Sequence, residues 1–169
     1  MRQSKRCLVV VLFAAAAIPV PVRGASPPSA ITPAEVLRLM ERVGDWQLAN
    51  PSGVDPTDWQ QAAGYAGIMA LAGMSQSPRF RDAMLRMGEA NRWQLGPRPY
   101  HADDHAVGQT YVELFQRRHE AAMLAPLQER FDWILAHPKD DDLDFDESKN
   151  PDRTDRWSWC DALFMAPPA

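Results

Sequence analysis

The C-terminal stretch carries the residues best suited to chemistry. Asp161 lies close in sequence to Trp157, Trp159, Phe164 and Met165, directly after a very polar run. A carboxyl group in apolar surroundings keeps its proton to higher pH than it does in water, which suits a general acid. The flanking indole faces suit a sugar ring, because one face of a pyranose is apolar while its edge carries hydroxyl groups. This stretch is therefore a candidate catalytic site.

Asp161 also has a purely structural interpretation. Ser158 and Asp161 have the spacing of a helix capping box, in which the acid only binds backbone N–H groups. A position at a helix start would favour the ionised carboxylate through the helix dipole, which works against the acid role. Spacing alone leaves both interpretations open.

A second acidic site follows a turn rich in glycine and proline. His101-Ala102-Asp103-Asp104-His105 places two carboxylates and two imidazoles within five residues. The pattern does not favour a metal site, because adjacent carboxylates do not easily turn inward together and no H-E-x-x-H spacing occurs. It fits a helix N-cap, and it also fits one half of a carboxylate pair with Asp161. Hydrolysis of a glycosidic bond commonly uses two such carboxyl groups, one protonated and one ionised.

A third acidic run, residues 140–147, resembles a calcium-binding loop only superficially. An EF-hand loop needs glycine at its sixth position and glutamate at its twelfth. Counting from Asp140 gives Phe145 and Pro151, and counting from Asp142 gives Glu147 and Arg153. Both registers fail, so we expect a solvated acidic loop and no metal ion.

The hydrophobic spacing predicts an all-α chain with no strand. Five helices are expected, with these approximate ranges: from Thr32-Pro33 to residue 46, 55–72, 78–90, 103–116 and 126–136. The first is amphipathic, with an apolar stripe formed by Val36, Leu39, Met40, Val43 and Trp46. The second has no charge from Ala62 to Met74 and contains Gly64, Gly67 and Gly73, which predicts a helix buried on all sides and closely packed.

Amphipathic and buried helices thus alternate along the chain. A chain of outer and inner helices joined by short turns can close into an α/α toroid, which is a double ring of helices. In any up-down arrangement, alternate helices run parallel, so the starts of the second, fourth and sixth share one rim. Those starts carry Asp58-Trp59, Asp103-Asp104 and the segment from Trp159 to Asp161. We therefore expect carboxylates and aromatic rings to converge at one opening.

The N-terminus has the pattern of an export signal. Residues 1–24 combine basic side chains with an apolar run from Leu8 to Val20, and residues 25–32 form a polar, proline-containing leader. Cleavage near Gly24 would place the protein outside the cytoplasm, as a secreted or periplasmic protein. It would leave 14 basic against 22 acidic side chains, a net charge of −8, which argues against nucleic acid or an anionic membrane as partner. Only Cys160 would remain, so no intrachain disulfide is expected.

Three motifs together resemble a known enzyme family. The stretch from Trp157 to Pro168, the run Asp103-Asp104-x-x-x-Gly108-Gln109-x-Tyr111, and Trp59 with Gly64-Tyr65 are similar to motifs of glycoside hydrolase family 105. These enzymes are the unsaturated rhamnogalacturonyl hydrolases, which are close to the unsaturated glucuronyl hydrolases of family 88. The resemblance runs from about Pro33 to the C-terminus, and its last motif is highly specific. It implies an (α/α)6 toroid.

The resemblance also implies a reaction and roles for individual residues. Family members remove the unsaturated uronic acid that polysaccharide lyases leave at a chain end, here expected on pectin-derived oligosaccharides, by hydrating its C4=C5 double bond without a metal or organic cofactor. Asp161 would protonate C4 and activate the water. Asp104 or Asp103 would supply the partner carboxylate, with Asp104 preferred, and Trp59, His101 and Trp159 would line the sugar pocket. Each of these three could equally serve packing or capping.

The length of the chain departs from the family pattern. An (α/α)6 toroid has twelve helices, and this chain stops at the start of the sixth, so we expect an N-terminal half that is unstable or inactive without the missing C-terminal half. Open apolar faces on the second and fourth helices are the expected consequence. Two alternative functions remain: a secreted, non-catalytic module that binds glycans through its tryptophans, and a related sugar hydrolase that acts on other lyase products or on saturated glycosides.

Overall fold

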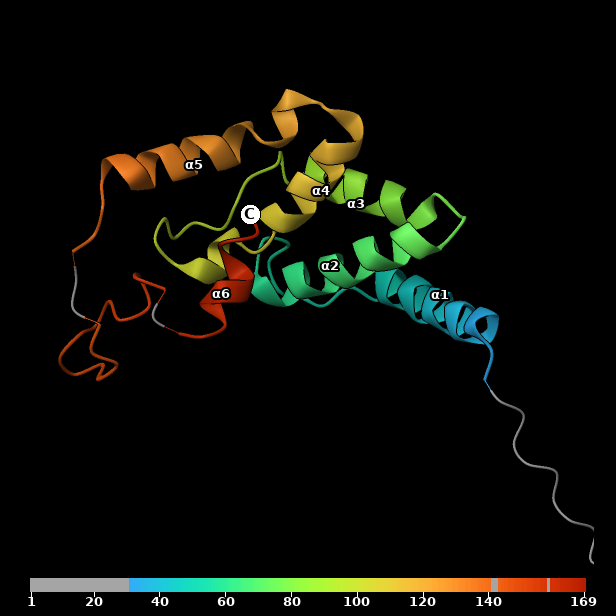
Figure 1. The fold of residues 1–169 in the computed structure, drawn as a ribbon, viewed down its shortest axis with the longest axis horizontal. Coiled ribbons are helices and arrows are strands. Elements are labelled where there is room, and N and C mark those ends of the chain that lie inside the picture. The colour runs from blue at the N-terminus through green and yellow to red at the C-terminus, as the bar shows by residue number, and fades with distance from the viewer. Residues whose placement is uncertain (1–30, 141–142, 158) are drawn as a thin grey trace, which may run out of the picture. The chain divides into compact units, whose positions relative to one another are not determined.

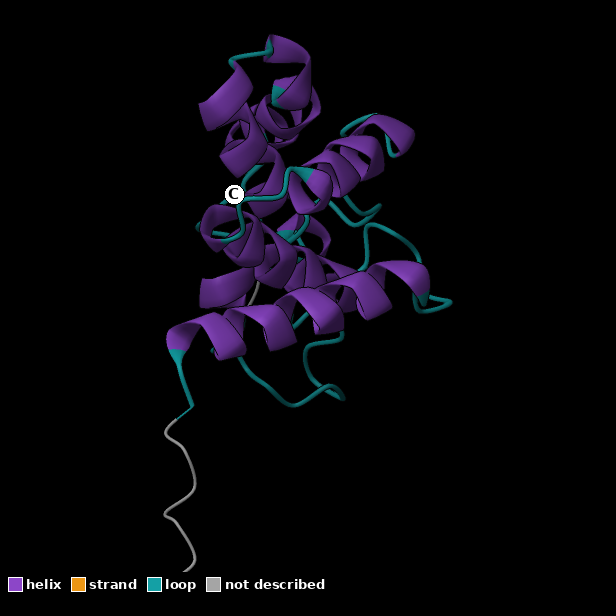
Figure 2. Ribbon diagram, turned by 90° about the vertical axis from the view of Figure 1, so that its right-hand side faces the viewer, coloured by secondary structure: helices purple, strands orange, loops and turns teal. Residues whose placement is uncertain are grey.

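The computed structural model of the chain describes residues 31–140, 143–157 and 159–169. The expected signal peptide (1–24), the leader up to residue 30, and the capping residue Ser158 lie outside the described residues. Thr32–Ala169 forms one unit. Within the described ranges every regular element is a helix and no strand occurs, which confirms the all-α prediction (Figure 2).

The elements follow the predicted order with two differences. Their bounds are α1 (Pro33–Ala49), α2 (Trp59–Met74), α3 (Arg79–Ala90), the 3-10 turn η1 (Ala102–His105), α4 (Gly108–Arg118), the 3-10 turn η2 (Ala121–Met123), α5 (Ala125–Ala136) and α6 (Ala162–Met165) (Figure 1). The second helix starts later than expected, and the fourth is divided into η1 and α4. The other helices lie close to their predicted positions.

Local capping explains where the first two helices start. Thr32 and Glu35 form a complete capping box at the start of α1. Before α2, Asp55 accepts hydrogen bonds from the backbone N–H and hydroxyl of Thr57, which holds residues 55–57 in a turn. Asp58 then accepts from the backbone N–H of Gln60 at 2.8 Å and acts as the N-cap. The helix therefore begins at Trp59 rather than near residue 55.

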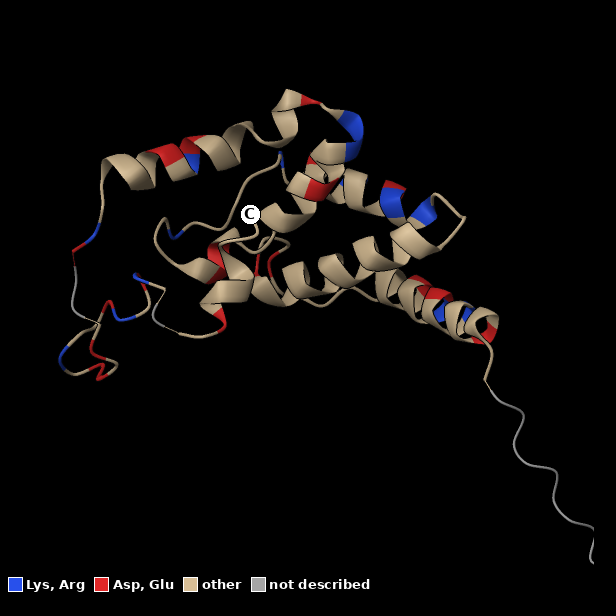
Figure 3. Ribbon diagram, in the orientation of Figure 1, with Lys and Arg blue, Asp and Glu red and all other residues tan. Residues whose placement is uncertain are grey.

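Helix α2 is the centre of the packing, with α1, α3 and α4 all in contact with it. It carries no charged residue, whereas α1 and α3 carry both signs of charge (Figure 3). Its buried side chains join the α3 residues Phe80 and Met84, together with Leu114 of α4, in one hydrophobic core. Burial of these apolar surfaces is the main stabilising contribution to this part of the fold.

The apolar stripe of α1 does not face this core. Val36, Leu39, Met40, Val43 and Trp46 are all exposed, with 37–65% of their surface accessible. The helix instead contacts its neighbours through the adjacent face, on which Leu37 and Leu48 are partly buried and Gly44 is fully buried. Gly44 permits this approach, because a Cβ there would lie 2.7 Å from Leu71 Cδ2 and 2.9 Å from Phe80 Cε1.

The prediction that α2 is closely packed on all sides is wrong for the described chain. Nothing lies within 4 Å of a Cβ placed at Gly64, Gly67 or Gly73. All three glycines are exposed, whereas Ile68, Met69 and Leu71 of the same helix are buried. The absence of charge on α2 therefore does not reflect complete burial here. Open faces on this helix are what the expected N-terminal half of a toroid would have.

A second hydrophobic core supports the C-terminal segment. Val107, Tyr111 and Leu95 pack there with Met165 and Ala166 of the α6 region. The side-chain amide of Gln109 donates to the backbone oxygens of Phe164 and Met165, which ties the start of α4 to α6. Turn η1 also contacts α6. These contacts bring residues 101–105 next to residues 157–165.

The described residues contain neither a membrane-spanning helix nor a candidate metal site. None of their helices has the length and apolar character needed to cross a membrane. No group of three or more histidine, cysteine or acidic residues within the described ranges could hold a metal ion.

Candidate active site

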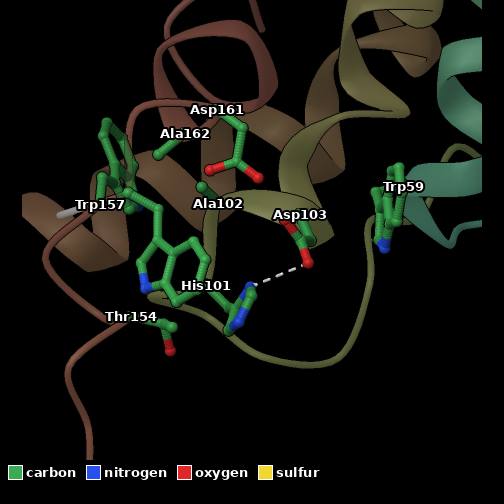
Figure 4. A pocket seen from close by; sticks show the side chains of 9 residues that line it. Trp59, His101, Ala102, Asp103, Thr154, Trp157, Asp161 and Ala162 are labelled. Atoms are coloured by element: carbon green, nitrogen blue, oxygen red, sulfur yellow. Dashed lines mark ion pairs between the residues drawn. The ribbon is translucent and has the colours of Figure 1, made fainter. Parts of the chain in front are cut away.

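One cavity of about 240 Å³ brings together the three predicted segments. It lies between the start of α2, turn η1 and the C-terminal segment, and Figure 4 shows its side chains (lining residues Trp59, His101, Ala102, Asp103, Thr154, Trp157, Trp159, Asp161 and Ala162). Five of the six predicted site residues line it, and Asp104 does not. The helix starts thus converge at one opening as the alternation of helices predicted.

Asp103 contributes the half-buried carboxylate of the cavity. Burial raises its pKa above the usual aspartate value, and the negative charges of Asp161 and Asp104 act in the same direction. Arg98, and His101 when it is protonated, oppose this shift without cancelling it. The His101 Nδ1 atom lies 3.6 Å from Asp103 Oδ2 (Figure 4). Asp103 therefore holds a proton to higher pH than an exposed aspartate does.

Asp104 points into a different environment. Its carboxylate accepts a 2.6 Å hydrogen bond from Arg98 Nη2, a second from Arg98 Nε at 3.1 Å and a third from the Arg98 backbone N–H at 2.6 Å. The group is 7% exposed, and it packs so closely against Gly96 that a Cβ at residue 96 would lie 2.5 Å from Asp104 Cγ. Asp104 thus anchors the loop before η1 and does not face the cavity.

Asp161 is exposed and precedes α6 as its N-cap residue. Its side chain makes no capping hydrogen bond. In Figure 4 its carboxylate faces the same space as that of Asp103. The negative charge of Asp161 lies close enough to contribute to the raised pKa of Asp103. The described contacts of Asp161 thus favour a group available to a ligand over a structural cap.

Trp157 is a wall of the cavity. Its indole was noted as suited to a sugar ring, but it was not among the six predicted site residues. Its backbone has a φ of 54°, which is uncommon for a non-glycine residue. Its indole Nε1 donates a 2.9 Å hydrogen bond to the carbonyl oxygen of Tyr100. No local pattern could reveal a contact between residues 57 positions apart. Thr154 and the small residues Ala102 and Ala162 also line the cavity without a sequence signal.

His105 lies behind the cavity wall and is fully buried. Its ring packs against Phe131, with centroids 5.0 Å apart, and against Trp157 at 5.9 Å. Burial is the largest cause that lowers its pKa, to about 4, and the charge of Arg130 adds to the effect. His105 is therefore a neutral packing residue at physiological pH.

Comparison with known proteins identifies the family. Residues 35–169 match the family model described as Glycosyl Hydrolase Family 88. The chain is 31% identical over 153 residues to an unsaturated 3S-rhamnoglycuronyl hydrolase of Alteromonas sp. strain LOR, with 78% of this chain and 37% of that protein covered. It is 34% identical over 140 residues to a protein of the same name from Formosa agariphila, with 79% and 36% covered.

The chain thus spans just over a third of the length of these relatives. The motifs of residues 59–65, 103–111 and 157–168 resembled glycoside hydrolase family 105, which is close to family 88, and the matches agree with that resemblance. Together with the cavity geometry, they lead to one conclusion: the chain belongs to glycosyl hydrolase family 88.

Proposed function

We propose that this chain supplies the carboxylates of an enzyme that removes an unsaturated uronic acid from the end of an oligosaccharide. The observation that carries the proposal is the cavity in which Asp103 and Asp161 face each other among Trp59, Trp157 and Trp159. Two carboxyl groups can exchange protons with a substrate, and the indoles provide apolar surfaces for its ring. Family membership supports the same reaction class.

The proposed chemistry is hydration of the C4=C5 double bond. A carboxyl group of the enzyme donates a proton to C4, and a water molecule attacks C5. The water keeps one hydrogen in the new hydroxyl group at C5 and gives its other proton to the enzyme. The resulting hemiketal at C5 opens to a ketone, and the hemiacetal exposed at C1 then releases the remaining sugar as an alcohol. The net reaction consumes one water and needs no electron donor or acceptor.

Asp161 is the proposed acid/base, and Asp103 is the proposed partner carboxyl. Asp161 is exposed to the cavity and makes no capping hydrogen bond, so it is available to protonate C4 and to accept a proton from water. Asp103 has a raised pKa and can donate a hydrogen bond to the substrate from its protonated form. Asp104, preferred from the sequence, is occupied by Arg98 and is assigned a structural role.

The unsaturated uronic acid carries a carboxylate, and the cavity offers no lysine or arginine of the described residues to pair with it. His101 is the one described lining residue able to become cationic. We therefore propose that further groups that bind the uronate lie outside the described residues. The relatives are named as 3S-rhamnoglycuronyl hydrolases, which supports rhamnose as the neighbouring sugar. The pectin-derived, rhamnogalacturonan-type substrate rests on the motif resemblance alone.

The test follows the ultraviolet absorbance of the double bond with the full gene product and an unsaturated uronyl disaccharide. We expect the absorbance to disappear as free sugar is released, and we expect a saturated disaccharide of the same composition to remain intact. Cleavage of the saturated disaccharide at a comparable rate would refute hydration. Binding of both without turnover would instead favour the non-catalytic glycan-binding module.

We also propose that the protein is exported, as a secreted or periplasmic protein. The basic start, apolar run and possible cleavage site in residues 1–24 support this. Mass spectrometry of the mature N-terminus should find a chain that begins near residue 25, and an uncleaved cytoplasmic protein would contradict the proposal.

A further inference from the structure

The loop that precedes η1 is built around Asp104. Both parts of Arg98 bind its carboxylate: the backbone N–H donates at 2.6 Å, and the guanidinium donates from Nη2 at 2.6 Å and from Nε at 3.1 Å. The backbone N–H of Gly96 also donates to the Asp104 carbonyl oxygen at 2.8 Å. A Cβ at residue 96 would lie 2.5 Å from Asp104 Cγ, so this close approach requires glycine. These contacts hold the guanidinium of Arg98 against turn η1.

The Arg98 guanidinium lies near acidic groups that belong to two walls of the cavity. Its pKa is raised first by the hydrogen bond to Asp104, and the charges of Asp104, Asp103 and Asp58 act in the same direction. Asp103 lines the cavity from η1, and Asp58 caps α2 directly before the lining residue Trp59. Turn η1 and α2 are in contact. Arg98 is therefore a cation close to both walls, although it does not itself line the cavity.

Charges of both signs act on the carboxyl group of Asp103. Burial is the largest cause of its raised pKa, and the negative charges of Asp161 and Asp104 raise the pKa further. Two groups lower it, namely His101 when it is protonated, and Arg98. An arginine keeps its proton throughout the pH range in which enzymes work, whereas a histidine does not. Arg98 is thus the permanent positive charge among the groups that act on Asp103.

We propose that Arg98, held on Asp104, is a positioning residue that places a permanent positive charge near Asp103 and so controls how the reaction responds to pH. This inference rests on the proposed function, in which the protonated form of Asp103 donates to the substrate. Activity then falls as pH rises and Asp103 loses its proton. The positive charge of Arg98 favours the ionised carboxylate, so it brings this fall to lower pH, while the negative charge of Asp104 acts in the opposite direction.

The test uses the full gene product and follows kcat/KM for the loss of double-bond absorbance against pH, because this profile reports ionisations of the free enzyme. Arg98→Gln removes the positive charge, so the alkaline limb of the profile should move to higher pH by roughly 0.5–1 pH unit. The shift is modest because the Arg98 side chain is 56% exposed and its charge is screened. Asp104→Asn removes the negative charge, so its alkaline limb should move to lower pH by a similar amount.

The opposite signs separate this role from a purely structural one. Both substitutions break the same guanidinium–carboxylate pair, so a structural pair would lower the melting temperature and the rate in both variants without moving the alkaline limb. Arg98→Lys keeps the charge and should keep the limb at the wild-type pH. Arg79→Gln is the matched control, because Arg79 Nε forms a comparable ion pair with Asp45 Oδ1 at 2.8 Å between α3 and α1. It should leave the limb in place.

Alkaline limbs that stay in place, or that move in the same direction in the two variants, would overturn the positioning role. If Arg98→Gln does not fold, Asp104→Asn decides alone, because its amide oxygen can still accept the backbone N–H of Arg98. An unmoved limb in that variant overturns the role as well. A wild-type protein that leaves the double bond intact at every pH would instead refute the proposed function, and this inference with it.

Discussion

At the scale of single residues, three consecutive side chains point into three different environments. Asp103 faces the cavity, Asp104 binds Arg98, and His105 is buried behind Trp157. The 3-10 turn η1 distributes these consecutive side chains over three directions, because its tight rotation places successive residues roughly a third of a turn apart. The sequence located this cluster correctly but could not assign the direction of each residue.

Substitution of Asp104 should affect folding before it affects chemistry. Asp104→Ala removes the acceptor for the backbone N–H and the guanidinium of Arg98 in a buried setting. We expect the free energy of unfolding to fall by about 1–3 kcal/mol, the usual cost of a buried hydrogen-bonding group that loses its partner. Urea denaturation measures this loss. Asp132→Ala, at an exposed position on α5, should change stability by no more than about 0.5 kcal/mol.

His105 should make the folded state sensitive to mild acid. Its pKa is about 4 in the folded state, against 6.5 for an ordinary histidine. Above pH 6.5 both states carry a neutral imidazole, so stability is complete there. Between pH 6.5 and 4 the unfolded state binds the additional proton, so stability falls as pH falls, by about 3 kcal/mol in total.

The measurement for His105 is the unfolding free energy between pH 4 and pH 7. The variant His105→Leu removes the titrating group and should lower the slope in this window, whatever its effect on the absolute stability. An unchanged slope in the variant would show that other groups cause the acid sensitivity.

At the scale of elements, the helix starts were largely predictable. Thr32 and Pro33 have the local chemistry of an N-terminus, and Ser77-Pro78 likewise precedes α3. Apolar spacing was less informative about which face is buried. On α1 the regular apolar stripe is exposed, and the contact with α2 and α3 goes through a face with Gly44 at its centre. Apolar periodicity shows that one face of a helix is apolar, but it does not show whether another element covers that face.

The glycines of α1 and α2 offer a matched pair of substitutions. Gly44→Ala would bring a methyl group within 3 Å of Leu71 and of the fully buried Phe80, so we expect a loss of about 1–3 kcal/mol. Gly67→Ala meets no atom within 4 Å and should stabilise the protein by about 0.5–1 kcal/mol, because alanine restricts the unfolded chain and favours the helix. Thermal denaturation of both variants measures the sign, and equal signs would contradict the packing described.

At the scale of the whole molecule, the alternation of helices predicted the site better than any single motif did. It placed the starts of the second, fourth and sixth helices at one rim, and Trp59, Asp103 and Asp161 do share one cavity. The role of Trp157 depends on contacts between Tyr100, His137 and the C-terminal segment, which are set by tertiary packing. The closed toroid itself stays a prediction.

Helices α1 and α2 each have a face that no other described element covers. The chain covers 36–37% of the length of its relatives. We therefore predict little or no loss of double-bond absorbance with the 169-residue chain, because no lysine or arginine among the described residues lines the cavity to bind the uronate. Full turnover by the isolated chain would contradict this prediction.

The central claim is that Asp161 performs the chemistry and does not merely cap a helix. Asp161→Asn in the full gene product tests it most directly, by the initial rate of double-bond loss together with the melting temperature. We predict a rate at least about a hundredfold lower, as expected for a lost acid/base, with the melting temperature unchanged because Asp161 makes no capping hydrogen bond. A retained rate, or a lower melting temperature with activity reduced only in proportion to unfolding, would contradict the claim.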